Sequence, residues 1–361
     1  MPIHFTEKQW ANVREVYGRW WAGTLERPLM KVVVPGVHSP GREKSKAPRL
    51  SQANVHDLSW SPEELIDALD YELCQNEYLG DSFPFVNFNF FGPGVLAAFC
   101  GARLDNRSGG VWFFPQEKLP IEDISVRYDP ENQWVQRVKD IYRAGQARWG
   151  GGVLMSMPDL SGILDVAAVF RGSEDLLMDL YDEPEEVHRL CREVQQAWWD
   201  AYHDLSSVLF PQSPGYSDWS GLYSAAPSYI LQSDFTYMVG PDMFRAFALP
   251  YIREDCRALA NSIYHLDGVG ELPHLDSLLQ IPELNAVQWV YGDGQPSARH
   301  WPEVYQKIAA AGKRIYMVGD AEDLAVISQS IPRGLYMDYQ MNDLAAARAL
   351  LARYSVEPII D

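Results

Sequence analysis

The chain has 361 residues, of which 47% are hydrophobic and 22% charged, and its formal net charge is −19. This composition predicts a soluble globular protein with a large core, and its negative surface argues against a nucleic-acid partner. The absence of a bilayer-length apolar run, of a signal-peptide pattern and of any CxxC pair among four scattered cysteines predicts a cytoplasmic protein without a membrane anchor or disulfides.

Helical and strand patterns alternate from the N-terminus onward. Residues 6–22 have apolar residues at helical spacing, and the β-branched run RPLMKVVVPG predicts a strand at 28–35. Residues 37–60 are polar and rich in Pro and Ser, which predicts a long loop. Ser61, Pro62 and Glu64 are the start signals of a helix that we expect to run over 61–79.

Further strand patterns follow at regular intervals, with helical patterns between most of them. The expected strands are 83–90, 152–159, 215–221, 262–268, 286–293, 313–320 and 334–340, and the expected helices include 173–205, 240–261, 272–281, 301–312 and 321–331. With the strand at 28–35 this makes eight strands, which favours a single (β/α)8 TIM barrel over 1–361, with 1–27 as an N-terminal helical extension. A doubly wound open sheet is the alternative. Residues 111–138 do not fit the repeat, and we expect them to cover one end of the barrel.

Polar residues gather where these strands end, which is where barrel enzymes place their chemistry. The candidate substrate-binding residues are Asn87, Asn89, Asp159, Trp219, Gln232, Asp234, Gln288, Asp320 and Tyr339, and the candidate catalytic residues are Asp218, His265 and Asp267. A single Asp at a strand end is usually a helix cap or turn former. Convergent carboxylates repel one another, so several of them together need a proton, a cation or a ligand.

His265 and Asp267 are two residues apart on one expected strand, so their side chains point to the same face. Three interpretations stay open for this pair. The two can bind zinc or another divalent metal, they can act as an acid/base pair, or Asp267 can simply hydrogen-bond a buried His265. We expect His274, in the following helical pattern, to face away from the site.

Several stretches resemble the uroporphyrinogen decarboxylase superfamily, which includes corrinoid-dependent methyltransferases. They are WWAGTLERPLMKVVV, YSDWSG followed by FRAFALPYIRE, YHLDG, and GLYMDYQMNDLAAARALLARY, and together the resemblance spans about residues 20–350. It implies a (β/α)8 barrel with extra N-terminal helices. For the methyltransferase branch it also implies zinc held by His-x-Cys at the fifth strand and by a second Cys near the last strand.

The sequence departs from both branches at the functional positions. The region after the first strand, VVVPGVHSPGREKSK, lacks the arginine pattern of the decarboxylases, and Arg42 and Lys44 are not equivalent by position. Asp267 stands where the first zinc-binding Cys is expected, and Asp338, Gln340 and Met341 occupy the second Cys region. A His/Asp site is harder than a His/Cys site, which favours an oxygen-bound substrate or no metal over thiolate activation.

Our leading hypothesis is a barrel enzyme of this group, a methyltransferase that works with a corrinoid protein on a small methylated substrate. His265 and Asp267 are its candidate metal ligands. A cofactor-free lyase, decarboxylase or carbohydrate-active enzyme is the first alternative, because 12 Trp and 19 Tyr accompany the strand-end acids. A non-catalytic barrel that binds a small molecule is the second.

Overall fold

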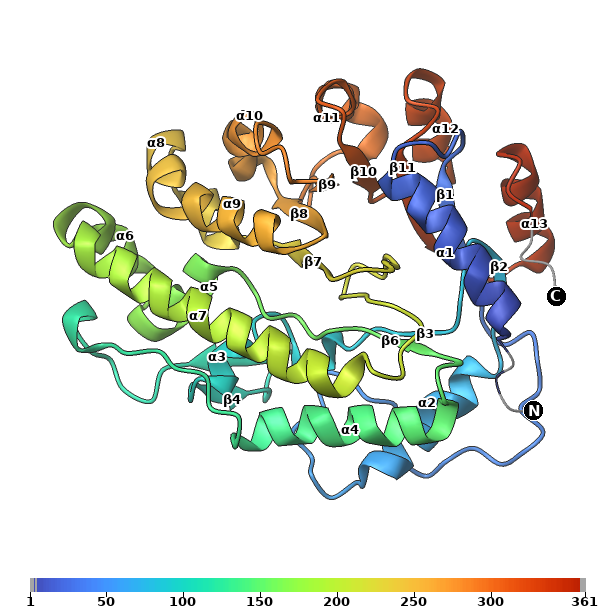
Figure 1. Cartoon of the computed structure of the whole chain (residues 1–361), viewed down its shortest axis with the longest axis horizontal. Helices are drawn as coiled ribbons and strands as arrows, with labels where there is room; N and C mark the ends of the chain where they lie inside the picture. Colours follow the sequence, from blue (N-terminus) through green and yellow to red (C-terminus); the bar gives the residue numbers. More distant parts are fainter. Residues whose placement is uncertain (1–2, 4, 358–361) are drawn as a thin grey trace.

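The computed structural model describes residue 3 and residues 5–357 as a mixed α/β fold with a mostly parallel central sheet (Figure 1). Its α-helices are α1 Glu7–Trp21, α2 Pro62–Leu73, α3 Leu96–Phe99, α4 Gln133–Trp149, α5 Ile163–Arg171, α6 Ser173–Asp182, α7 Pro184–Leu209, α8 Pro241–Met243, α9 Leu249–Ala258, α10 Leu275–Leu279, α11 Pro302–Ala310, α12 Ala321–Ser330 and α13 Leu344–Arg353. Its strands are β1 Leu29–Val34, β2 Glu77–Gly80, β3 Phe85–Val86, β4 Arg103–Asp105, β5 Trp112–Phe114, β6 Leu154–Met155, β7 Ser228–Leu231, β8 Asn261–Asp267, β9 Ala286–Val290, β10 Arg314–Met317 and β11 Leu335–Gln340.

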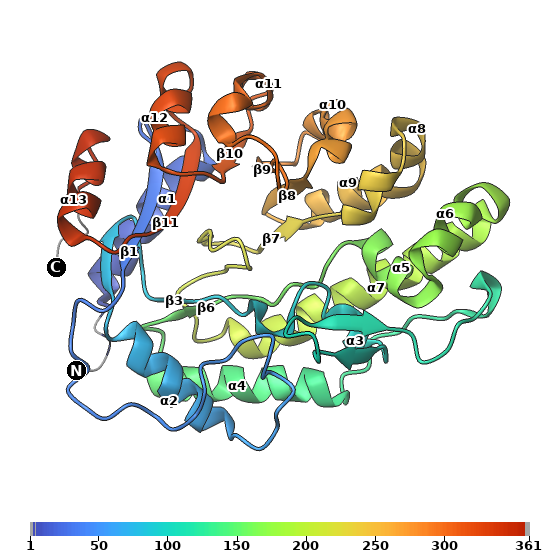
Figure 2. The same cartoon turned by 180° about the vertical axis from the view of Figure 1, so that it is seen from behind.

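The main sheet has seven strands in the order β2-β1-β11-β10-β9-β8-β7. All neighbouring strands in this sheet are parallel except β1 and β2. The first strand of the chain, β1, also pairs with the last strand, β11. Figures 1 and 2 show the helices α9 to α13 on the outer side of these strands. The alternation of strands and helices in the sequence therefore predicts the parallel pairing correctly.

Strands β3 and β6 form a separate parallel pair. Residues next to these strands make hydrogen bonds on either side of the pair. The Val32 amide of β1 donates to the Ser82 hydroxyl, which precedes β3, at 2.7 Å, and the Met157 amide, which follows β6, donates to the Ser217 carbonyl at 2.9 Å. In the described part of the chain no strand ladder closes these two junctions. Closure into an eight-stranded barrel therefore stays a prediction.

Helix α1 covers the N-terminal ends of the strands. Its Trp10, Val13, Tyr17 and Trp20 are buried in one cluster with residues from both sheets, among them Leu29, Phe83, Leu154, Ile230, Ile263 and Tyr336. The indole of Trp20 also donates to the Leu335 carbonyl at 3.1 Å. Because inward residues alternate along each strand, the positions two steps further on, such as Lys31, His265 and Asp338, lie nearer the C-terminal ends.

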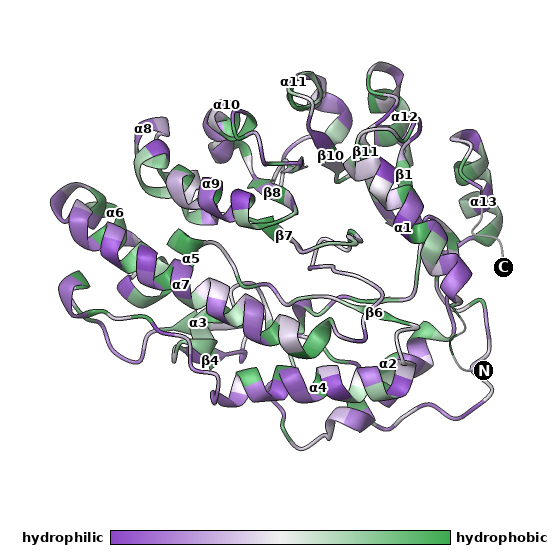
Figure 3. Ribbon diagram, in the orientation of Figure 1, coloured by the Kyte–Doolittle hydropathy of each residue, from purple (hydrophilic) through white to green (hydrophobic). Residues whose placement is uncertain are grey.

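Amphipathic helices cover β3 and β6. The buried faces of α4 and α7 include Val138, Tyr142, Leu190 and Trp198, and Figure 3 shows polar and apolar residues alternating along both helices. None of the helices in the described residues is long and apolar enough to cross a membrane.

Three of the predicted elements differ from the observed ones. The single helix expected over 173–205 is two helices, α6 and α7, which are separated at Glu183 before Pro184. Residues 215–221 form no strand, because the Gly221 amide bonds back to the Asp218 carbonyl and Gly221 has a φ of +72°, which turns the chain. The strand of this unit is β7, further along. The helix expected over 61–79 ends at Leu73, and residues 77–80 instead pair antiparallel with β1. The other seven predicted strand regions each contain an observed strand.

Candidate active site

The predicted pair on β8 lies beside a third acid. One ligand atom from each of Asp234, His265 and Asp267 falls within 4.8 Å of the others, and Nε2 of His265 is 4.0 Å from Oδ2 of Asp267. Asp234 starts a short 3₁₀ helix, Asp234–Met238, directly after β7. Because β7 pairs parallel with β8, its C-terminal end brings Asp234 next to the pair.

Gln288 orients the imidazole of His265. The two residues are register partners on the neighbouring parallel strands β8 and β9, and Nδ1 of His265 lies 2.5 Å from Oε1 of Gln288. An amide oxygen only accepts hydrogen bonds, so Nδ1 carries the proton and the lone pair of Nε2 faces the acids. Burial lowers the pKa of His265, although Gln288 and Asp267 act in the opposite direction. The ring is therefore held as a neutral base with Nε2 available.

The acids around His265 are crowded. Asp234 borders solvent, yet the protein atoms packed around its carboxyl raise its pKa to about 6, and the charge of Asp267 adds to the effect. Burial raises the pKa of Asp165 to about 7, with a contribution from Asp234. Burial also raises the pKa of Glu271, whose carboxyl accepts from the Thr236 hydroxyl at 3.0 Å and from the Asp267 amide at 3.2 Å. A proton or a cation would relieve the repulsion in this cluster.

A cavity of about 560 Å³ opens beside the cluster. Asp165 and Asp234 line it together with Trp112 and Phe113 of the β4–β5 hairpin. Of this hairpin, β5 belongs to the stretch 111–138 that did not fit the strand pattern, whereas β4 lies before it. Sequence reasoning missed Asp165, because it lies in the first turn of helix α5, where its carboxylate accepts from the amides of Gly162 and Phe235.

Two further predicted acids are buried away from this cavity's lining. Asp218 accepts from the Ser220 amide at 2.8 Å, and burial raises its pKa to about 6. Asp159 accepts from the Ser161 amide at 2.8 Å, and burial raises its pKa to about 7. Both hydrogen bonds are those of carboxylates that shape turns. Their roles in substrate binding or proton transfer stay predictions.

Trp219 connects the His265 cluster with the residues that follow β3. Its ring lies edge-on to the His265 ring, with centroids 5.1 Å apart. Its carbonyl accepts from the Asn87 side chain at 2.9 Å, and the Asn87 amide oxygen in turn accepts from the backbone of Asn89. Asn89 Oδ1 is buried and has no hydrogen-bond partner among the described residues.

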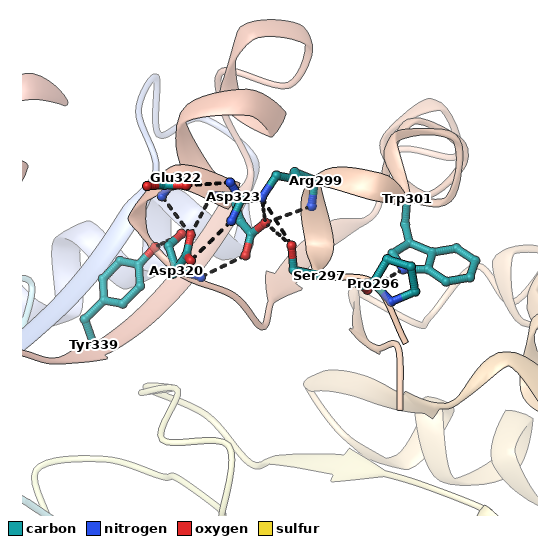
Figure 4. Close-up of polar contacts among 8 residues, drawn as sticks. All are labelled: Pro296, Ser297, Arg299, Trp301, Asp320, Glu322, Asp323 and Tyr339. Carbon is teal, nitrogen blue, oxygen red and sulfur yellow. Dashed lines mark hydrogen bonds and ion pairs between the residues drawn. The ribbon is translucent and has the colours of Figure 1, made fainter. Parts of the chain in front are cut away.

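Asp320, Tyr339 and Gln232, which were predicted to bind substrate, are not part of the cluster of Asp234, His265 and Asp267, and neither is His274. Asp320 caps α12 by accepting from the amides of Glu322 and Asp323, and its carbonyl accepts from the Tyr339 hydroxyl at 3.0 Å (Figure 4). The Gln232 side chain bonds to the Ser161 hydroxyl at 3.4 Å, in a small cavity that also borders α9. His274 is buried against Phe244 and lies 2.9 Å from the Thr236 carbonyl.

Sequence reasoning did not single out a second polar pair, Lys31 and Asp338. These are register partners on β1 and β11, and Nζ of Lys31 lies 2.9 Å from Oδ2 of Asp338. A lysine in an otherwise apolar strand is the signal that could have found it. The pair itself depends on the first and last strands being neighbours, which no local pattern reveals.

Comparison with known proteins supports the fold. No protein-family model matches the chain, and no curated protein matches it by sequence. Among the solved structures that match is a methyltransferase from Methanosarcina mazei, with a TM-score of 0.55 and 14% sequence identity over 87% of this chain and 95% of the other. At this identity the match shows a shared fold.

Proposed function

We propose that this chain is a methyltransferase-like enzyme that holds a divalent metal, with zinc as one candidate, through Asp234, His265 and Asp267. The observation that carries the proposal is the donor set itself, one imidazole nitrogen and two carboxylates within 4.8 Å. The fold shared with the M. mazei methyltransferase supports it. In this proposal a partner protein carries the corrinoid, the small methylated substrate binds at the strand ends, and the two sheets complete a (β/α)8 barrel in one domain.

The donor atoms fit a metal of intermediate to hard character. Nε2 of His265 carries a lone pair, because the Nδ1–H donates its hydrogen bond to the Gln288 amide oxygen. The carboxylates of Asp234 and Asp267 supply two oxygen ligands, which favours zinc, manganese or iron over metals that need thiolates. When bound, such a metal would supply Lewis-acid polarisation of the substrate.

The other residues of the site bind and orient. Trp219 packs in a T-shaped contact with the imidazole and helps to hold the ring in place. Glu271 accepts from the Asp267 backbone amide and from Thr236, which anchors the end of β8. The cavity of about 560 Å³ is within the size range of small-molecule sites and gives a substrate access to Asp234.

Metal titration tests the donor set. Chelator-treated protein is titrated calorimetrically with Zn²⁺ and Mn²⁺, and we expect one equivalent to bind. His265→Ala should abolish this binding and Asp234→Asn should weaken it about tenfold or more. Asp242→Asn, which removes an exposed acid of α8, is the matched control and should bind like the wild type. Metal binding that His265→Ala leaves unchanged would contradict the proposed site.

Activity tests the reaction class. The metal-loaded protein is mixed with methylcobalamin and with candidate methyl acceptors that carry oxygen, nitrogen or sulfur. The loss of the methyl group from methylcobalamin is followed by the absorbance of the cobalamin. We expect the turnover rate to fall at least about 100-fold in His265→Ala, because catalytic side chains and metal ligands typically contribute rate factors of this size. If the protein binds the metal but demethylates neither free methylcobalamin nor a methylated corrinoid protein, the metal site is correct and the proposed reaction class is wrong.

One observation favours a second candidate, a lyase or carbohydrate-active enzyme. Asp165 lines the large cavity, and its pKa of about 7 leaves it partly protonated near neutral pH. A protonated carboxylic acid beside an ionised one is the arrangement of general acid and base catalysis. Activity that Asp165→Asn abolishes and that chelation leaves intact would favour this candidate.

A further inference from the structure

The Lys31–Asp338 pair lies on the wall of a cavity distinct from that of the His265 cluster. This second cavity has a volume of about 290 Å³, close to the lower end of the range for small-molecule sites. It lies between β1, β11, β3 and α2, and its lining includes Asn87 and Tyr339. The turn at residues 218–221 borders both regions, because Trp219 contacts His265 while the Gly221 carbonyl contacts Lys31.

The charges of this cavity are balanced, although the chain as a whole is strongly acidic. Its charged lining residues are two cations, Lys31 and Arg49, and two anions, Glu72 and Asp338. They form two ion pairs on the wall, with 2.9 Å between Lys31 Nζ and Asp338 Oδ2 and 3.3 Å between Arg49 Nε and Glu72 Oε2. The larger cavity contrasts with it, because both of its charged lining residues are acids, Asp165 and Asp234.

The Lys31 ammonium group has a donor to spare. Its side chain is almost fully buried, and within the described residues it donates to the Asp338 carboxylate and to the Gly221 carbonyl at 3.1 Å. An ammonium has three N–H groups, so one remains for a ligand. The rings of Phe83 and Phe85 lie 5.1 Å and 4.6 Å from Nζ, within the range of cation–π contacts.

Asp338 is the accessible half of the pair. Its side chain is about one-third exposed, at 33%, whereas that of Lys31 is 3% exposed. A ligand with only a carboxylate would approach Lys31 against the charge of Asp338, and a ligand with only an ammonium group would approach Asp338 against Lys31. A ligand that carries both charges can satisfy both residues and leaves the net charge of the cavity unchanged.

We propose that this cavity binds a small zwitterion, with the ligand carboxylate on Lys31 and the ligand ammonium group on Asp338. Asn87 is placed to add a polar contact, because it lines the same cavity. The aromatic walls, which include Phe85, Phe90 and Tyr339, suit the apolar part of such a ligand. The site is separate from the metal ligands, so its occupation needs neither metal nor corrinoid.

Calorimetric titration of the metal-free wild-type protein tests this site. The probes are glycine, β-alanine and N,N,N-trimethylglycine, compared with acetate and methylammonium at the same concentration and ionic strength. We expect at least one of the zwitterions to bind and both singly charged fragments to bind at least about tenfold more weakly. Equal binding of fragments and zwitterions, or no binding of any zwitterion, would overturn the proposal and leave the pair a structural role.

Variants locate the binding. Lys31→Met and Asp338→Asn should each weaken zwitterion binding about tenfold or more. Lys139→Met is the matched control, because Lys139 is also buried and its Nζ lies 2.6 Å from Asp204 on the helices α4 and α7. If Lys31→Met does not fold, the affinities of Asp338→Asn and of the wild type for the ligand series still test the proposal. Unchanged binding in Asp338→Asn would also overturn the proposal. Because metal is absent throughout, the result does not depend on the proposed function.

Discussion

Asp255 on α9 allows a sharp test of how burial controls stability in this protein. The residue is 3% exposed, and burial raises the pKa of its carboxyl from 3.8 to about 6, although the hydrogen bonds from Gln195 and Trp199 on α7 lower it. A shift of about 2 units corresponds to about 3 kcal/mol. Because the folded pKa is the higher one, the native state binds the proton more tightly. Stability is therefore greatest below the unfolded pKa and is lost as the pH rises through about 6.

Asp255→Asn removes this titration. Both hydrogen bonds reach the same oxygen, Oδ1, so the amide can keep them. We expect the free energy of unfolding of the variant, relative to the wild type, to rise by about 2 kcal/mol between about pH 4 and about pH 7, as measured by urea denaturation. The neighbour Glu254, whose pKa the Arg192 pair lowers, gives a control of opposite sign in Glu254→Gln. A relative stability of Asp255→Asn that stays flat across this range would refute the reasoning.

Three further predictions concern the site and its supports. Gln288→Leu should lower metal affinity about 10- to 100-fold, because the His265 ring loses its orienting acceptor; calorimetric affinity equal to the wild type would contradict this. Asp81→Ala should reduce the free energy of unfolding by about 3–5 kcal/mol, because Arg27 loses two bonds of 2.7 Å and 2.8 Å; a loss below about 1 kcal/mol in urea denaturation would argue against a strong pair. Gly221→Ala should cost about 1–3 kcal/mol in thermal unfolding, since the residue has a φ of +72° and its new Cβ would lie 2.9 Å from Lys31 Nζ; an unchanged melting temperature would show that this turn adapts.

The second half of the fold follows closely from the sequence. The strands β8 to β11 are apolar or β-branched runs followed by helical patterns, and each was placed within a few residues. The strand of the unit before them was predicted at 215–221 instead of at β7, because β7 has only four residues, all buried, and so lacks the alternation of a half-buried strand. The polar run around Asp218 resembled a strand end, but it is a buried turn whose carboxylate is bound to Ser220.

Only part of the candidate site could be predicted, because some of its residues depend on strand register and tertiary packing. His265 and Asp267 share a face because of strand periodicity, which a sequence shows directly. Gln288 was predicted as a substrate ligand, and its bond to His265 depends on the register of β8 and β9. Asp165 comes from the first turn of a helix and Lys31 from the middle of an apolar strand. Tertiary packing decides which partners such residues meet, and a sequence does not show those partners directly.

The hydrogen bond between Trp20 and Leu335 joins residues that are 315 positions apart, and β1 pairs with β11 across a similar separation. During synthesis the first helix and strand therefore leave the ribosome long before their partners exist. Contacts this distant in sequence slow folding, and a nascent chain with an open strand edge is prone to aggregation. Deleting β11 should accordingly remove native contacts of α1 and β1, which acquire their final partners only after β11 has been synthesised.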